Sequence, residues 1–264
     1  MTALSQLGLR MLPQVSRAGW QLVSIGVGLL LILLWYAVVQ ARLVSPVFLP
    51  GPERAWDALV YGLSEGELLA KTAATVERMI YGWLLASLVG IVVGAMIGVS
   101  DRTRAYVEPT LEFLRPLPAS AMMPVAIALL GLTDLMVLAV IAFGALWPML
   151  LATVHGFAAV EPRLYQVSRA LALSRTEVIW KIALPSAMPD ILSGMRVGLT
   201  IALILAVVGE MLASRPGLGQ AILLAARSFQ SADLYAGVIL LGLIGYVSGT
   251  ALSLIERRLL HWRV

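Results

Sequence analysis

The feature that most constrains the fold is a series of long segments without a charged residue. Five runs contain no Asp, Glu, Lys or Arg: residues 18–41, 79–100, 116–133, 135–160 and 234–255. A sixth, residues 191–213, is equally apolar except for Arg196 and Glu210. A helix needs about 20 apolar residues to cross the hydrocarbon core of a bilayer, and lipid offers no partner to an open backbone. We therefore predict an all-α membrane protein with six transmembrane helices.

Two of these runs need separate comment. Three prolines within residues 116–133 interrupt helical hydrogen bonding, so a short or kinked span is predicted there. The first run is longer than the apolar core of a signal peptide, and we interpret it as an anchor although residues 39–41 resemble a cleavage site. The expected organisation is a cytoplasmic tail, residues 1–17, followed by one six-span domain, residues 18–264.

Composition excludes several classes of function. Only 13% of the residues are charged, against about a quarter in soluble domains. The chain has no cysteine and two histidines, so neither a thiol site nor a histidine metal cluster is expected. The formal net charge is +4, but the basic residues are scattered between apolar runs, which argues against nucleic acid as a partner. We predict no catalytic, cofactor or metal site in this chain.

The basic residues instead indicate the orientation in the membrane. If the N-terminus is inside, the outer connections hold only six of the 19 lysines and arginines: Arg42, Arg54, Lys71, Arg78, Arg215 and Arg227. Because Lys and Arg accumulate in cytoplasmic loops, we predict that both termini are cytoplasmic. The polar connection at residues 161–189 then also lies in the cytoplasm.

Small residues suggest how the spans pack. Glycines recur four residues apart in three predicted spans: Gly90, Gly94 and Gly98, then Gly194 and Gly198, then Gly245 and Gly249. In lipid, such spacing lets helix backbones approach closely. We predict a tight helix contact at each of the three places, within one chain or between two chains.

Residues 161–189, EPRLYQVSRALALSRTEVIWKIALPSAMP, interrupt the apolar runs with an amphipathic segment. Leu164, Val167 and Leu171 fall on one face of a helix, and polar residues occupy much of the rest. A short amphipathic helix in the cytoplasm suits docking into the groove of a soluble partner. The alternative is that this helix lies on its own membrane domain.

Two further cytoplasmic elements follow from local motifs. Ser174 and Glu177 match a capping box, so we predict a turn there and a second helix, residues 176–184, that ends before Pro185. Asp101, Arg102 and Arg104 are charged, and we interpret them as a solvated cytoplasmic turn.

With these residues the chain resembles the permease subunits of binding-protein-dependent ABC importers, in the nitrate/sulfonate/taurine branch. Residues 164–194 resemble the EAA loop of that family, whose Leu-Pro pair and later proline match Leu184, Pro185 and Pro189. Other family motifs occur in the family's order: SPVFLPGP at 45–52, the Arg78/Gly82 pair, LRPLP at 114–118, GMRVGL at 194–199, VVGEML at 207–212 and PGLGQAI at 216–222. The resemblance covers the chain from residue 45 onward.

The resemblance implies a type I ABC importer permease fold, with a cytoplasmic coupling helix between spans four and five. It implies a homodimer of permease copies in a bacterial inner (plasma) membrane, two ABC ATPase subunits and an extracytoplasmic substrate-binding protein. The implied function is ATP-driven import of a small solute, such as nitrate, a sulfonate or taurine, by alternating access. The residues expected to dock the ATPase are Leu164, Gln166, Val167, Ser168, Arg169, Ala170, Leu171, Leu173 and Ser174.

Several residues depart from the family pattern. Gln166, Ser168 and Ala172 stand where the family usually has glutamate, alanine and glycine. A charge contact with the ATPase is therefore missing or supplied by Arg169. The family's PPLAW pattern reads PASAM at residues 118–122, which leaves the substrate open.

The chain itself shows no means of hydrolysing ATP. A Walker A motif needs a lysine that follows glycine and precedes Ser or Thr, whereas Lys71 and Lys181 follow Ala70 and Trp180. We predict that the chain is not an enzyme and that ATP and Mg²⁺ are used by the partner ATPase.

Charged residues inside a span are costly and usually face a bundle interior or an aqueous path. Arg196 and Glu210 lie 14 residues apart, or roughly 21 Å along a helix. We predict Glu210 near the outer gate, Arg196 near the inner mouth and Met122 along the translocation path. The alternative is structural: Arg196 reaches the cytoplasmic surface, and Glu210 pairs with an arginine at the outer end, such as Arg215.

Two other classes of function remain as alternatives. An ion-gradient-driven secondary transporter is expected to carry more buried carboxylates in its spans. A membrane enzyme needs a catalytic constellation, and the sequence contains no HExxH motif. His155 fits a packed interior residue better than a proton relay.

Overall fold

The computed structural model describes residues 17–261, and its elements are helices. In this part of the chain five helices are long and apolar enough to cross a membrane. They are α1 (Arg17–Gln40), α3 (Leu68–Gly98), α6 (Asp134–Ala158), α9 (Leu184–Ala213) and α11 (Ser231–Leu259). Of the predicted cytoplasmic tail, residues 1–16 lie outside the described residues.

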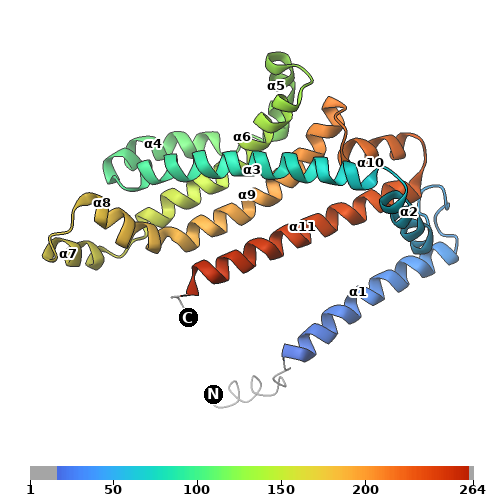
Figure 1. The fold of residues 1–264 in the computed structure, drawn as a ribbon, viewed down its shortest axis with the longest axis horizontal. Helices are drawn as coiled ribbons and strands as arrows, with labels where there is room; N and C mark the ends of the chain where they lie inside the picture. Colours follow the sequence, from blue (N-terminus) through green and yellow to red (C-terminus); the bar gives the residue numbers. More distant parts are fainter. Residues whose placement is uncertain (1–16, 262–264) are drawn as a thin grey trace, which may run out of the picture.

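The core is a layer of three helices in which α6 packs against both α3 and α9 (Figure 1). Glycines make both contacts close. A Cβ atom on Gly94 of α3 would lie 2.8 Å from the Leu150 carbonyl oxygen, and one on Gly194 of α9 would lie 2.7 Å from that of Pro148. The predicted contacts of the first two glycine stripes are therefore confirmed, and both are made to α6.

The third glycine stripe behaves differently. In α11, a Cβ atom on Gly245 would meet only the side chain of Leu203, at 3.5 Å, and Gly249 has nothing within 4 Å. Within the described chain this stripe makes no tight contact, because α11 packs through other residues, such as Ala236 and Leu240. A contact of the stripe with a second chain stays a prediction.

The third predicted span is a broken helix. Helix α4 (Asp101–Leu114) and the segment Ala119–Leu130, formed by the 3-10 turn η1 (Ala119–Met122) and α5 (Met123–Leu130), are apolar enough to count as one span but meet at 78°. The predicted kink is confirmed. The predicted turn at residues 101–104 is wrong, because Ser100 accepts a hydrogen bond from the Thr103 N–H and caps α4.

The segment predicted to be cytoplasmic forms α7 (Pro162–Ala170), α8 (Arg175–Val178) and a π-helical stretch, η2 (Ile179–Ala183), that continues into α9. The predicted helix end before Pro185 is wrong. Pro185 lies in the first turn of α9, where a backbone N–H has no partner within the helix, and the wider π turn joins α8 to α9 without a break.

The two ends of the molecule differ in content. Helices α7 and α8 and the end of α11 lie at one end in Figure 1, whereas α2 (Pro52–Ser64) and α10 (Leu218–Arg227) lie at the other. Helix α1 stands apart from the core and touches it near α2, where Trp35 donates to the Pro50 carbonyl oxygen at 3.0 Å and stacks on Tyr235.

Candidate functional site

The α7–α8 hairpin turns one face of α7 toward the membrane helices and the other outward. Ser168 is buried, its hydroxyl donates to the Tyr165 carbonyl oxygen at 2.8 Å, and Tyr165 packs against the cluster of Phe157 and Ala187. Burial, with Asp101 nearby, raises the pKa of the Tyr165 hydroxyl. Helix α7 is thus held through polar and aromatic side chains.

The apolar row of α7 points away from the chain. Leu164, Val167 and Leu171 are 37%, 52% and 65% exposed. Of the other residues predicted to dock an ATPase, Ser168 is buried and Leu173 is half-buried. The exposed ones are Gln166, Arg169, Ala170 and Ser174. The alternative that α7 covers its own membrane domain with this apolar row does not fit these positions.

The link between α7 and α8 combines a strained residue with a well-formed cap. Ala172 has φ of +49°, in the left-handed region that favours glycine. The predicted capping box is confirmed: Ser174 Oγ accepts from the Glu177 N–H at 3.3 Å, and Glu177 Oε2 accepts from the Ser174 N–H at 3.0 Å. The cap fixes the direction in which α8 enters the membrane domain.

At the opposite end of α9, Glu210 is fully buried in a polar cluster. Its carboxylate accepts hydrogen bonds from Thr75 Oγ1 at 2.9 Å, from Arg78 Nη1 at 3.0 Å and from the Gly219 N–H at 2.9 Å. These donors come from α3 and α10, so one carboxylate joins three helices. Gly217 is needed nearby, because a Cβ atom there would overlap the carboxylate.

Arg78 extends this cluster to the start of α6. It also donates to Asp134 Oδ1 at 3.1 Å and to the Pro216 carbonyl oxygen at 2.7 Å, and Asp134 pairs in turn with Arg215. Glu210 therefore pairs with an arginine, as the structural alternative expects, but the partner is Arg78, whereas Arg215 pairs with Asp134. Two arginines and two carboxylates balance in charge.

The remaining predicted pathway residues lie elsewhere. Arg196 pairs with Glu256 and donates to Ser253 Oγ at 3.2 Å, which ties α9 to the end of α11. Met122 is half-buried at the end of η1. The structure does not bring Glu210, Arg196 and Met122 together. Among residues 17–261, no group of three His, Asp or Glu could hold a metal ion.

Comparison with known proteins assigns the family. Residues 86–262 match the family described as binding-protein-dependent transport system inner membrane component. The chain belongs to this family and is a permease component of an ABC importer in the inner membrane, rather than its ATPase. The secondary-transporter alternative has no support from these findings.

Relatives along most of the chain carry related names. An aliphatic sulfonates transport permease protein, SsuC, of Bacillus subtilis is 32% identical over 95% of this chain and 91% of its own length. The taurine transport system permease protein TauC of Escherichia coli is 29% identical over 90% and 89%. The bicarbonate transport system permease protein CmpB of Synechococcus elongatus is 28% identical over 83% and 81%. The chain falls in the nitrate/sulfonate/taurine branch.

The fold has a counterpart among solved structures. A chain in an inward-facing structure of the MetNI methionine ABC transporter superposes with a TM-score of 0.65 at 17% identity, covering 73% of this chain and 95% of that chain. This likeness supports the type I importer permease fold. The chain thus provides the translocation pathway for a small solute.

Proposed function

We propose that this chain, as a homodimer, carries a small anion inward through a pathway opened and closed by two ATPase subunits docked on α7. The observation that carries the proposal is the exposed apolar row of Leu164, Val167 and Leu171 on a helix whose opposite face packs against the membrane core through Tyr165. A short amphipathic helix of this kind fits a groove on a soluble partner.

The path from α7 to the membrane core supports a role in coupling. Helix α8 runs through η2 into α9 without interruption, so motion of the docked hairpin reaches α9 directly. ATP and Mg²⁺ are bound and used by the ATPase subunits. Both termini lie on the ATPase side, and an extracytoplasmic binding protein delivers the solute to the end that holds α2 and α10.

The names of the relatives favour an anionic solute. Sulfonates, taurine and bicarbonate share a negatively charged oxyanion group, and these are the solutes for which SsuC, TauC and CmpB are named. We therefore propose a small oxyanion or organosulfonate as the solute of this importer.

Substitution of Val167 tests the docking face. Val167→Glu places a charge in the apolar row, and we expect loss of ATPase co-purification and of ATP-dependent uptake, with normal thermal stability. The matched control is Leu259→Glu, an exposed apolar position at the end of α11. If the ATPase co-purifies equally with both variants, α7 is not its docking helix.

A further inference from the structure

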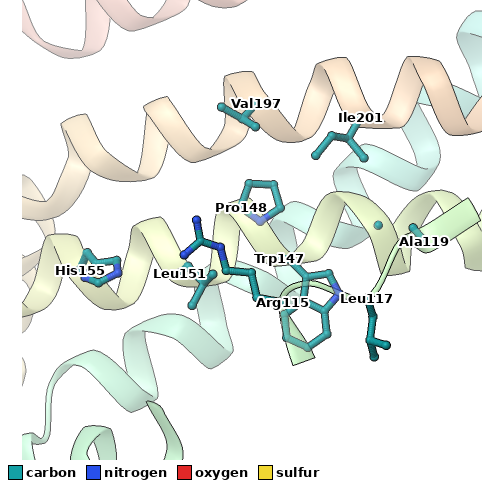
Figure 2. Close-up of a pocket in the computed structure, with 10 residues that line it drawn as sticks. Arg115, Leu117, Ala119, Trp147, Pro148, Leu151, His155, Val197 and Ile201 are labelled. Atoms are coloured by element: carbon teal, nitrogen blue, oxygen red, sulfur yellow. The ribbon is translucent and has the colours of Figure 1, made fainter. Parts of the chain in front are cut away.

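A cavity of about 470 Å³ opens beside α6. Its lining includes no residue of the α7–α8 hairpin and none of the polar cluster formed by Glu210, Thr75, Arg78, Asp134 and Arg215. The segment between α4 and η1 forms one wall, and α6 and α9 form the others (Figure 2). Its walls include Arg115, Leu117, Trp147, His155, Val197 and Ile201. None of these residues belongs to the predicted pathway set of Glu210, Arg196 and Met122.

The charges around this cavity are all of one sign. Arg115 and His155 are the ionisable residues among those that line it, and no Asp or Glu is among them. Arg115 has an ion-pair partner in Glu112, but the two atoms are 3.5 Å apart and both side chains are about half exposed. Such an exposed pair is weak, so most of the guanidinium N–H groups remain available.

Two further donors, from Trp147 and His155, line the cavity. Trp147 Nε1 is buried and has no hydrogen-bond partner within the described chain. A buried donor without an acceptor is rare in native proteins. His155 carries at least one ring N–H in any protonation state. Trp147, Leu151 and His155 follow each other at one-turn intervals on α6, and in Figure 2 the Arg115 guanidinium extends along this row toward His155.

We propose that this cavity is an oxyanion site on the translocation pathway, in which Arg115 binds the charged head of a small sulfonate-type solute. The guanidinium offers a fork of N–H groups that suits an oxyanion, and Trp147 and His155 of α6, which line the same cavity, carry further N–H donors. Leu117, Val197 and Ile201 form an apolar wall for a short carbon chain. This inference rests on the proposed function, because it places that importer's solute at a defined position.

The phosphate of an anionic lipid presents the same chemistry as a sulfonate. The test therefore uses the complete permease–ATPase complex in nanodiscs of phosphatidylcholine alone and, in parallel, with phosphatidylglycerol added. Ethanesulfonate is the binding probe, followed by saturation-transfer NMR, and native mass spectrometry detects retained lipid. The variants are Arg115→Gln and Arg115→Lys, with Arg102→Gln as the control because Arg102 is an exposed arginine in the first turn of α4, the helix that Arg115 directly follows.

In phosphatidylcholine we expect Arg115→Gln to weaken ethanesulfonate binding about tenfold, Arg115→Lys to retain part of it, and Arg102→Gln to match the wild type. Equal binding by wild type and Arg115→Gln, or binding by neither, overturns the site. Phosphatidylglycerol retained by wild type but not by Arg115→Gln, with sulfonate excluded, makes this a lipid site and also overturns the proposal.

Uptake into proteoliposomes separates this inference from the proposed function. If the wild-type complex with its binding protein imports no taurine, ethanesulfonate, nitrate or bicarbonate, the proposed anion import fails. If it imports one of them, and Arg115→Gln imports it at the same rate with normal ATP hydrolysis, only the oxyanion site fails.

Discussion

Arg78 and Arg115 both lie beside α6, Arg78 at its first residue and Arg115 farther along it, and their surroundings are opposite. Arg78 is largely buried and contacts two carboxylates and a backbone carbonyl oxygen. Arg115 is largely exposed beside a cavity whose lining carries no acid. The first arginine makes three hydrogen bonds to the chain and fixes helices to each other. The second has only the exposed Glu112 as its ion-pair partner, which leaves most of its N–H groups available for a transient solute.

The difference has an energetic basis. Burial of an ion pair removes two charges from water, so loss of one partner leaves an uncompensated charge in the core. An exposed pair such as Arg115 with Glu112 loses little when it is broken. Variants in the polar cluster around Glu210 and Arg78 should therefore change the free energy of unfolding. Variants in the cavity beside Arg115 should change solute binding.

The largest effect is expected for Glu210→Gln. The variant leaves Arg78 without its buried counter-charge, and we expect the free energy of unfolding to fall by about 3–5 kcal/mol. The matched control is Glu67→Gln, which removes an exposed carboxylate that pairs with Lys71 one turn away, and its effect should stay within about 0.5 kcal/mol. Reversible unfolding in lipid nanodiscs measures both. A similar small loss of unfolding free energy in both variants would mean that the polar cluster around Glu210 does not stabilise the fold.

Arg78→Lys tests whether geometry matters in addition to charge. A lysine ammonium cannot reproduce the forked contacts to Asp134, Glu210 and Pro216. We expect a loss of about 1.5–3 kcal/mol in the free energy of unfolding, whereas Arg115→Lys should leave it unchanged. If the two lysine variants melt at the same temperature, the contrast between the two arginines is not one of stability.

The helix contacts that hold both arginines in place give a third test. Gly94→Val forces a side chain into the backbone of α6, and overpacking of this kind costs about 1–3 kcal/mol. Gly249→Val adds the same side chain where nothing lies within 4 Å, and it should be neutral for the isolated chain. Thermal unfolding of the two variants measures the difference. Equal losses would show that the α11 stripe packs against another chain.

The sequence predicted the spans, the kink and the capping box, because each depends on a local pattern of apolar residues, prolines or caps. It also predicted that Glu210 is exceptional. It could not pair Glu210 with Arg78, because the two lie 132 positions apart and only the packing of α3 on α9 brings them together. Arg215 is near Glu210 in sequence, which made it the expected partner.

The continuous join of α8 to α9 and the cavity escaped prediction for other physical reasons. The rule that a proline ends a helix does not apply when the proline falls in the first turn of the next helix, as Pro185 does. The cavity residues come from three separate segments of the chain, and none of these residues stands out by itself in the sequence. In the sequence, Arg115 of the LRPLP motif indicates only topology. The fold places it at the same cavity as His155 and Trp147.

The smallest expected effect concerns backbone strain at Ala172, between α7 and α8. Ala172→Gly relieves a left-handed backbone conformation, and we expect a gain of about 1 kcal/mol in the free energy of unfolding. The control is Ala170→Gly, at the last helical position of α7, which should give no gain because glycine weakens helices. Hydrogen exchange of the 161–178 segment localises the change. A loss of stability in Ala172→Gly would contradict the assigned strain.

The unbroken run from Arg175 to Ala213 is 39 residues long, or roughly 58 Å at helical rise, nearly twice the hydrocarbon thickness of about 30 Å. One tip carries the Ser174 cap, and the other carries Glu210. A tilt of only about 5° around the midpoint shifts each tip by roughly 2.5 Å, given that half-length. That distance is comparable to the length of the hydrogen bonds around Glu210. A small tilt of the helix at the Ser174 tip is therefore enough to break these hydrogen bonds at the other tip.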